Sequence, residues 1–233
     1  MTETRQREAR CMTTRREAGM RQLFDDRYET LPWESVDTFV FDIGGVIISF
    51  NPAELASEIF PEDPALADRI RERTAASPYW GMLDRGTIDY REAEDLMTGM
   101  QEELRPAIRR FLGEWVRHMK PVPEGIALLR EAKRRGKQVL ILSNNHRKAF
   151  DLQAALNPVL LEPDGCLISS DVQILKPDPC IYRILQIRYS LNPERTLFID
   201  DNPVNVESAL QLGWQGFCLN RRGKLAAFTG LEE

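Results

Sequence analysis

The sequence predicts an α/β protein built on a three-layer, Rossmann-like parallel sheet, with an all-helical segment inserted after the first strand. Two observations predict this class. Short apolar runs typical of buried strands alternate with helical patterns over residues 120–219, which implies parallel pairing with right-handed crossovers. Another buried run comes earlier, and residues 51–119 between them show helical periodicity without a convincing strand. We therefore expect a core domain from residues 36–50 and 120–233, interrupted by a helical domain over 51–119.

Composition narrows the class of protein. The 233 residues are 42% hydrophobic, enough for one sizeable core or a core with a smaller module. A net charge of −5 argues against a general nucleic-acid binder, and no apolar run is long enough to cross a membrane. The cysteines lack CxxC spacing and are expected to be reduced thiols of a cytoplasmic protein; they are Cys11, Cys166, Cys180 and Cys218.

Residues 1–35 form a separate segment that is rich in Arg, Glu and Thr and has little apolar content before Leu23. We expect an N-terminal extension that is helical or disordered. The segment has no apolar signal-peptide core, and its glutamates argue against an organelle transit peptide.

The first predicted strand begins at Val36 and ends at Asp42, which is followed by Ile43 and two glycines. An apolar, β-branched and aromatic run of this kind is typical of a strand buried on both faces. A carboxylate at the end of such a strand is costly to bury without partners. Gly44 and Gly45 allow the backbone to bend tightly and let a ligand approach its N–H groups.

The segment over residues 51–119 begins with Asn51 as a predicted helix N-cap and Pro52 in the first turn. Apolar residues then recur at helical spacing, which predicts an insert of helical-bundle type. Four apolar residues within it suit either the bundle core, which we favour, or the lining of a pocket: Tyr79, Trp80, Met82 and Leu83.

The remaining strands and helices alternate regularly. A helix from Pro123 ends at Gly136, and helices are also expected from His146, after Lys176 and after Asn202. The predicted strands are Gln138–Leu142, Cys166–Ser169, Thr196–Ile199 and Trp214–Leu219.

Polar residues collect at three strand ends, namely at Asp42, at Ser143 and Asn144, and at Asp200 and Asp201. In a parallel sheet these ends share one edge, where ligands of open α/β sheets bind. Clustered carboxylates repel one another, and Mg²⁺ prefers such oxygen ligands, so Asp42, Asp200 and Asp201 predict a Mg²⁺ site.

A phosphate group fits beside that metal. Lys176 opens a helix near the same edge and supplies positive charge, while Ser143, Asn144 and the N–H groups of Gly44 and Gly45 can donate hydrogen bonds. Asp42 would then face the phosphoryl group as a covalent nucleophile. Each residue alone is explained equally well as a turn former, a helix cap or a loop residue. Their joint occurrence at strand ends favours a site.

Four motifs carry a family resemblance: FDIGGV, LSNN, LKPDPCIY and FIDDNPVNVESALQLG. Over residues 37–219 the chain resembles the haloacid dehalogenase-like hydrolases, and within them the sugar phosphatases typified by bacterial α-D-glucose-1-phosphate phosphatase. The resemblance implies that Asp42 is the nucleophile and that Asp200, Asp201 and the Gly44 carbonyl hold Mg²⁺.

The same resemblance implies that Ser143, Asn144 and Lys176 bind the phosphoryl group. It also implies that the helical insert is a mobile cap that closes over the substrate and selects it.

The sequence departs from the family pattern at Gly44, where phosphatases of the superfamily usually carry an Asp that acts as general acid and base. The related sugar phosphatases often lack this acid as well. Its loss removes a contribution of about 10²–10⁴-fold unless another group replaces it. His146 is a candidate replacement, although a solvent-exposed helix start explains it better. Arg85 is a candidate substrate contact, although a surface role explains it better.

These observations predict a Mg²⁺-dependent phosphatase that acts on a small phosphorylated metabolite, such as a sugar phosphate. A metal-independent dehalogenase is disfavoured because Asp200 and Asp201 would repel a carboxylate substrate. The alternative from another class is a weak or inactive protein that binds a phosphometabolite or a protein partner. The sequence identifies neither the substrate nor the oligomeric state.

Overall fold

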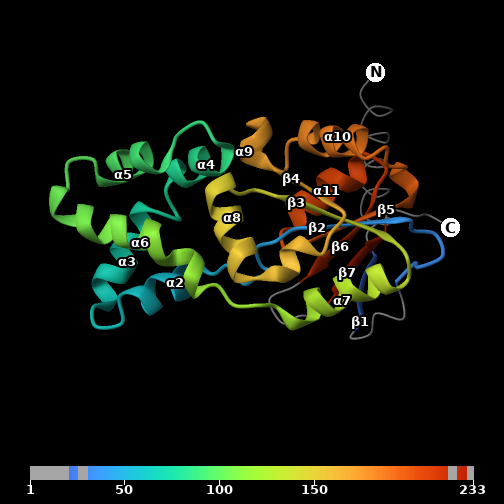
Figure 1. Ribbon diagram of the computed structural model, residues 1–233, viewed down its shortest axis with the longest axis horizontal. Coiled ribbons are helices and arrows are strands. Elements are labelled where there is room, and N and C mark those ends of the chain that lie inside the picture. Colours follow the sequence, from blue (N-terminus) through green and yellow to red (C-terminus); the bar gives the residue numbers. More distant parts are fainter. Residues whose placement is uncertain (1–20, 26–30, 220–224, 230–233) are drawn as a thin grey trace, which may run out of the picture.

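The computed structural model describes residues 21–25, 31–219 and 225–229, and these form the predicted α/β architecture around one seven-stranded sheet (Figure 1). The strand order is β1-β7-β6-β5-β2-β3-β4, and the five strands from β6 to β4 run parallel. The strands are β1 (Arg21–Asp25), β2 (Thr38–Phe41), β3 (Gln138–Ser143), β4 (Gly165–Ile168), β5 (Thr196–Asp200), β6 (Gln215–Leu219) and β7 (Leu225–Thr229).

Two strands at one edge were not predicted from the sequence. β7 pairs antiparallel with β6, and β1 pairs antiparallel with β7. The expectation of helix or disorder for the N-terminal extension is therefore wrong for Arg21–Asp25, while residues 1–20 and 26–30 lie outside the described residues. An open sheet edge presents unpaired N–H and C=O groups, so it can recruit a segment whose own sequence pattern is weak.

The sheet has a hydrophobic core on each face, as a three-layer arrangement requires. Phe39 and Phe41 of β2 pack into one core with residues of α7 (Pro123–Arg134) and α8 (Arg147–Leu156). Val40, which points to the opposite face, packs with α10 (Pro179–Arg188) and α11 (Pro203–Gln211). The alternation follows from the two-residue period of a strand.

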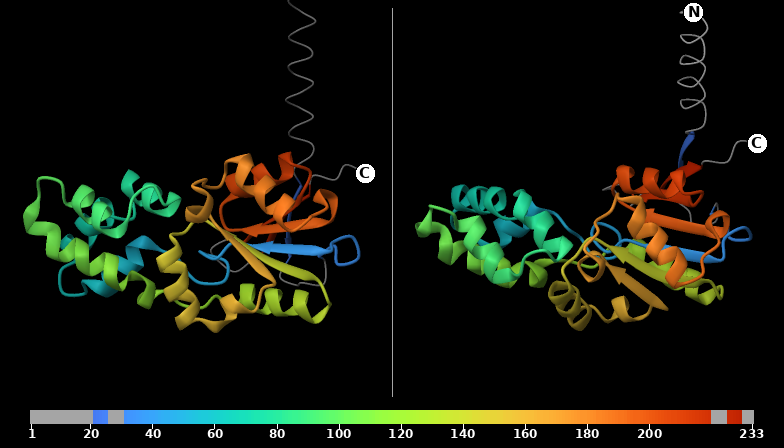
Figure 2. Two further views of the ribbon diagram at one scale, coloured as in Figure 1. Left: turned by 45° about the horizontal axis from the view of Figure 1, so that its top comes forward. Right: turned by 90° about the horizontal axis from the view of Figure 1, so that it is seen from above.

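The helical insert is the segment from α2 to α6. It contains α2 (Pro52–Ile59), α3 (Pro64–Arg73), α4 (Pro78–Arg85), α5 (Tyr90–Thr98) and α6 (Arg105–His118), with a 3₁₀ turn over Glu102–Leu104. Four of these helices begin with proline in the first turn, where the missing N–H costs nothing. Asn51 is the N-cap of α2 as predicted, since its side chain accepts from Ala53 N at 3.1 Å. Figure 2 shows the insert standing beside the sheet.

Two connections join the insert to the core, and they are hydrogen-bonded to each other. Ser49 N donates to the Lys120 carbonyl at 2.7 Å, and Val122 N donates to the Ile47 carbonyl at 2.9 Å. Apolar residues of α6 belong to the same hydrophobic cluster as Phe39. The insert is thus continuous in packing with the core. None of the helices in the described ranges combines the length and apolar character that crossing a bilayer requires.

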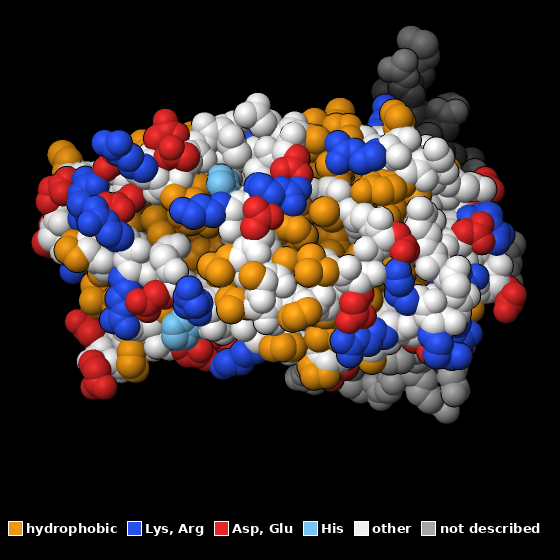
Figure 3. All heavy atoms as spheres, in the orientation of Figure 1, with side chains coloured by type: hydrophobic (Ala, Val, Ile, Leu, Met, Phe, Trp, Pro, Cys, Tyr) orange, Lys and Arg blue, Asp and Glu red, His pale blue; other side chains and the backbone are white. Residues whose placement is uncertain are grey.

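The outer surface of the insert is rich in ion pairs. Arg105 lies between Glu94, Asp95 and Glu102, and Arg109 also pairs with Glu94. Figure 3 shows basic and acidic side chains interspersed over this part of the molecule. Arg105 and Glu94 are only partly exposed and link these pairs into a network, and burial of the apolar face of the insert adds to its stability.

Candidate active site

Three carboxylates meet at the carboxyl edge of the sheet. Phe41 of β2 pairs in register with Ile199 of β5, so Asp42 and Asp200 follow side by side. One oxygen from each of Asp42, Asp200 and Asp201 lies within 4.8 Å of the others. The parallel register therefore assembles the cluster that the sequence predicted.

Lys176 lies between two of these carboxylates. Its Nζ is 2.8 Å from Asp42 Oδ1 and 2.7 Å from Asp200 Oδ2, and it donates to the Leu142 carbonyl at 3.0 Å. The side chain of Lys176 is 1% exposed. Burial opposes its charge, but the carboxylates of Asp200 and Asp42 prevail and raise the pKa of Lys176. The lysine therefore stays charged and neutralises part of the cluster.

The negative charge of the cluster exceeds what Lys176 supplies. Burial raises the pKa of Asp42 to about 6, opposed by Lys176 and assisted by Asp200. Burial also raises the pKa of Asp201 to about 7, with the charges of Asp42 and Asp200 adding to the effect. Asp42 Oδ1 is buried, and its charged neighbour is the ammonium of Lys176 at 2.8 Å. Three acids share one ammonium group, so the site favours a further cation.

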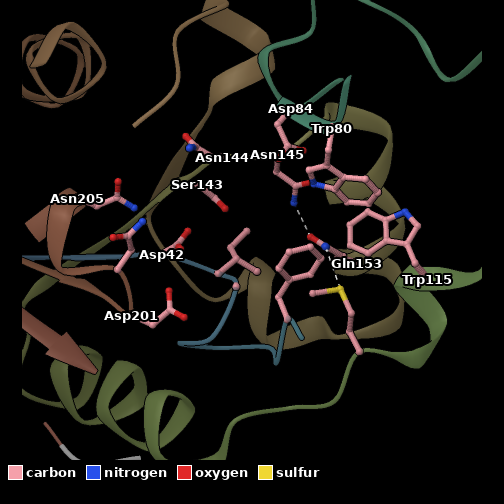
Figure 4. A pocket seen from close by; sticks show the side chains of 15 residues that line it. Asp42, Trp80, Asp84, Trp115, Ser143, Asn144, Asn145, Gln153, Asp201 and Asn205 are labelled. Carbon is pink, nitrogen blue, oxygen red and sulfur yellow. Dashed lines mark hydrogen bonds between the residues drawn. The ribbon is translucent and has the colours of Figure 1, made fainter. Parts of the chain in front are cut away.

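Asn144 positions Lys176. Its Oδ1 accepts from the Lys176 N–H at 2.7 Å, and its Nδ2 donates to the Lys176 carbonyl at 3.0 Å. Both ends of this amide are therefore engaged with the backbone of Lys176, and contact between Asn144 and a phosphoryl group stays a prediction. Ser143 is buried beside it and lines the pocket described below (Figure 4).

Asn205 was missed at the sequence level. Its Nδ2 lies 3.1 Å and 3.0 Å from the two oxygens of Asp200, and the Asn202 N–H donates to Asp200 Oδ1 at 2.8 Å. Asn205 is buried in the first turn of α11, directly after the acidic pair. The sequence did contain a signal for Asn205, namely a polar residue in the first turn of the helix that follows Asp200 and Asp201. That turn faces the end of the preceding strand.

The absence of a side chain on Gly45 allows Asp201 to join the carboxylate cluster. Gly45 has a φ of +73°, and a Cβ atom there would lie 2.3 Å from Asp201 Oδ2. Its N–H donates to the Ile48 carbonyl at 2.8 Å, so the expectation that Gly45 offers this group to an anion is wrong for this conformation. Gly45 is needed for close approach instead. Gly44 lines the pocket and has room for a Cβ, 3.4 Å from Phe50 Cβ.

A pocket of about 270 Å³ lies between the cluster and the helical insert. Its lining from the core comprises Asp42, Ile43, Gly44, Ser143, Asn144, Asn145, Gln153, Asp201, Asn202 and Asn205. The insert and its two connections add Phe50, Trp80, Asp84, Trp115 and Met119. In Figure 4, Asp42 and Asp201 lie on one side of this pocket, and Trp80 and Trp115 lie on the other.

The position of Trp80 changes one interpretation made from the sequence, which treated bundle core and pocket lining as alternatives. Trp80 packs 5.9 Å from Phe50 and 5.1 Å from Trp115, measured between ring centroids. It is both part of the bundle core, as favoured from the sequence, and part of the pocket lining. Tyr79, Met82 and Leu83 are absent from the lining among the described residues.

His146 and Arg85, the two candidates considered outside the strand-end cluster, do not line the pocket. His146 is the N-cap of α8, where its Nδ1 accepts from Lys148 N at 3.2 Å. Its ring packs edge-on against Tyr90 with centroids 5.1 Å apart. Arg85 is exposed, and the described pocket lining contains neither His146 nor Arg85. The surface interpretation fits Arg85. His146 begins a helix as expected, but it is half-buried against Tyr90 rather than exposed to solvent.

The side chains of Asn145, Gln153 and Met119 connect the core to the end of the insert. Asn145 Nδ2 donates to Gln153 Oε1 at 2.7 Å, and Gln153 Nε2 lies 3.3 Å from Met119 Sδ, as the dashed lines in Figure 4 mark. This chain of contacts fixes one wall of the pocket with satisfied polar groups.

The family model for haloacid dehalogenase-like hydrolases matches residues 36–213. The chain belongs to this hydrolase family. An (S)-2-haloacid dehalogenase of Burkholderia cepacia is 28% identical over 82% of this chain and 85% of that protein. A phosphatase of Mycobacterium tuberculosis is 24% identical over 82% of this chain and 90% of its own length.

The fold of the family is also seen in solved structures. A family enzyme from Bacteroides thetaiotaomicron, crystallised with magnesium and inorganic phosphate, superposes with a TM-score of 0.64 at 18% identity. The match covers 80% of this chain and 95% of that one. The relatives of this hydrolase thus include both dehalogenases and phosphatases, and the pocket has to distinguish the two chemistries.

Proposed function

We propose that this hydrolase is a Mg²⁺-dependent phosphatase that cleaves a small phosphorylated metabolite, such as a sugar phosphate, through an aspartyl-phosphate on Asp42. The observation that carries the proposal is the cluster of Asp42, Asp200 and Asp201 beside the buried ammonium of Lys176. Such a surplus of carboxylate oxygens suits a hard divalent cation. The residues that would hold Mg²⁺ are these three acids and the carbonyl of Gly44.

The charge of the pocket lining supports a metal for a second reason. The described lining contains the carboxyl groups of Asp42, Asp84 and Asp201 but no Arg, Lys or His. The carboxylates of Asp42 and Asp201 would repel a phosphoryl dianion. Bound Mg²⁺ would supply the missing positive charge and polarise the phosphoryl oxygens.

The residues of the chain then account for the reaction. Asp42 is placed at the pocket wall, where its carboxylate can attack phosphorus in line with the leaving oxygen. Lys176 keeps Asp42 oriented through the 2.8 Å contact, and Asn144 holds Lys176 in place. Ser143 can donate its hydroxyl to a phosphoryl oxygen. Water subsequently hydrolyses the aspartyl-phosphate and restores Asp42.

The same lining argues against dehalogenation, which several relatives catalyse. A haloacid carries a carboxylate that needs a cationic partner, and Lys176 is already enclosed between Asp42 and Asp200. Asp201 adds a further negative charge at the pocket wall. Electrostatic repulsion therefore disfavours a haloacid unless it is neutralised.

The deciding experiment measures phosphate release from a panel of sugar phosphates and from acetyl phosphate, each with Mg²⁺ and with a chelator. We expect Mg²⁺-dependent release. Chloride release from (S)-2-chloropropionate in the presence of chelator would replace the proposal with dehalogenation. Tight binding of inorganic phosphate without any turnover would favour a binding protein.

A further inference from the structure

Asp84 is an acid of the helical insert that faces the active-site pocket. It lies in the last turn of α4, one helical turn after Trp80, and both side chains line the cavity. Residues four apart share a helix face, so Trp80 and Asp84 reach the pocket together. Asp84 is half-buried. In Figure 4 its side chain lies above the pocket, next to Trp80 and away from Asp201.

The backbone around Asp84 is fixed against the core. Ser169 Oγ donates to the Asp84 carbonyl at 2.5 Å, and Gln173 Nε2 donates to the Gly86 carbonyl at 3.4 Å. Gly86 has a φ of +75°, and a Cβ atom there would lie 2.8 Å from Ser170 Cβ. The end of α4 is thus pressed against α9 (Ser169–Val172), which places Asp84 by direct contact with the core domain.

The proposed reaction lacks a proton donor at the usual place. Cleavage of an unactivated phosphomonoester releases an alkoxide that needs a proton, and Gly44 has no side chain to give one. His146 lies outside the described pocket lining. Of the carboxyl groups in that lining, Asp42 is assigned to attack and Asp201 to the metal. Asp84 is the remaining acid.

The surroundings of Asp84 favour its protonated form. Burial raises the pKa of Asp84 well above its usual range, and the charge of Asp42 raises it further, while a hydrogen bond from Trp80 opposes the shift. Two acids of one pocket with different environments are typical of an acid paired with a nucleophile.

We propose that Asp84 is the general acid of this hydrolase and that its substrates are phosphomonoesters with poor leaving groups. This inference rests on the proposed function. As Asp42 Oδ bonds to phosphorus, the P–O bond to the leaving group breaks and that oxygen takes the proton of Asp84. The Asp84 carboxylate then accepts a proton from the water that attacks the aspartyl-phosphate. The P–O bond to Asp42 breaks, inorganic phosphate leaves, and both acids return to their starting states.

The test compares Asp84→Asn with the wild type on phenyl phosphates of one shape whose substituents change the leaving-group acidity. Measurement of kcat/KM isolates the steps up to formation of the aspartyl-phosphate. We expect a loss of about 10²–10⁴-fold for phenyl phosphate and a loss at least tenfold smaller for p-nitrophenyl phosphate, whose leaving group needs no acid. Asp68→Asn, an exposed acid of the same insert, is the matched control.

Each outcome decides the inference. An equal loss across the series would show a binding or structural role and overturn it. A wild type active only on p-nitrophenyl and acetyl phosphates would also overturn it, because no proton donor would be operating, while the proposed function would stand. A wild type that releases phosphate from no ester or acyl phosphate would end the proposed function and this inference together. Melting temperature and far-UV circular dichroism verify that Asp84→Asn is folded.

Discussion

The two sides of the pocket are built on different principles. The core side gathers its carboxylates at the ends of neighbouring parallel strands, where Lys176 contacts both Asp42 and Asp200. The insert side presents an aromatic wall that includes Trp80 and Trp115, with a single acid beside it. We therefore expect the two sides to have different roles. The core side would perform the phosphoryl chemistry, and the insert side would shape the substrate and deliver a proton.

The largest effect is expected on the core side. Asp42→Asn removes the nucleophile and should reduce Mg²⁺-dependent phosphate release by at least about 10³-fold. The substitution is isosteric, so circular dichroism and melting temperature should remain those of a folded protein. Full activity of this variant would assign the chemistry to another residue and remove the basis of the comparison.

A second prediction concerns the metal. Asp201→Asn replaces a proposed ligand and should weaken Mg²⁺ binding by at least about tenfold. Mg²⁺ titration by calorimetry or by melting temperature measures this without reference to activity. Glu207→Gln on α11 is the matched control, since it removes an exposed acid near the site without touching the cluster. Equal affinities for the two variants would argue that Asp201 does not bind the metal.

Substitution of two glycines distinguishes the effect of backbone strain from the effect of crowding at the site. Gly45 and Gly136 both have positive φ, but only a Cβ on Gly45 meets Asp201; nothing described lies within 4 Å of one on Gly136. Gly136→Ala should reduce the free energy of unfolding by about 1–2 kcal/mol from strain alone. Gly45→Ala should reduce the free energy of unfolding by more than this and should also weaken Mg²⁺ binding. Urea unfolding and Mg²⁺ titration of both variants test this, and matching results would mean that Asp201 moves aside freely.

The smallest effect is expected on the insert side. Trp80→Phe keeps an apolar ring but loses contact area with Phe50 and Trp115 and the hydrogen bond to Asp84. We expect KM for ring-bearing substrates to rise about 2–10-fold, with a smaller change for acetyl phosphate. Steady-state kinetics on both substrates measures the difference. A larger loss for acetyl phosphate would show that Trp80 acts on the core side, and the proposed division between the two sides would fail.

Sequence patterns were sufficient to predict which charged residues gather at the carboxyl edge of the sheet. Asp42, Asp200 and Asp201 were predicted together because a parallel sheet brings the carboxyl ends of its strands to one edge, and Lys176 was added because it opens a helix near that edge. The helical character of the insert likewise follows from its periodicity and prolines. Helix periodicity and the residue types at strand ends can both be read from short stretches of sequence.

The tertiary structure decided the contacts between distant segments. Asn144 pairs with the backbone of Lys176 across 32 positions, and Ser169 fixes the end of α4 across 85 positions. Those contacts place Asp84 in the pocket and engage Asn144 with the lysine. β1 and β7 join the sheet by backbone pairing at an edge, which needs no distinctive side-chain pattern. Such contacts depend on how separate elements pack, and periodicity along the chain does not encode that geometry.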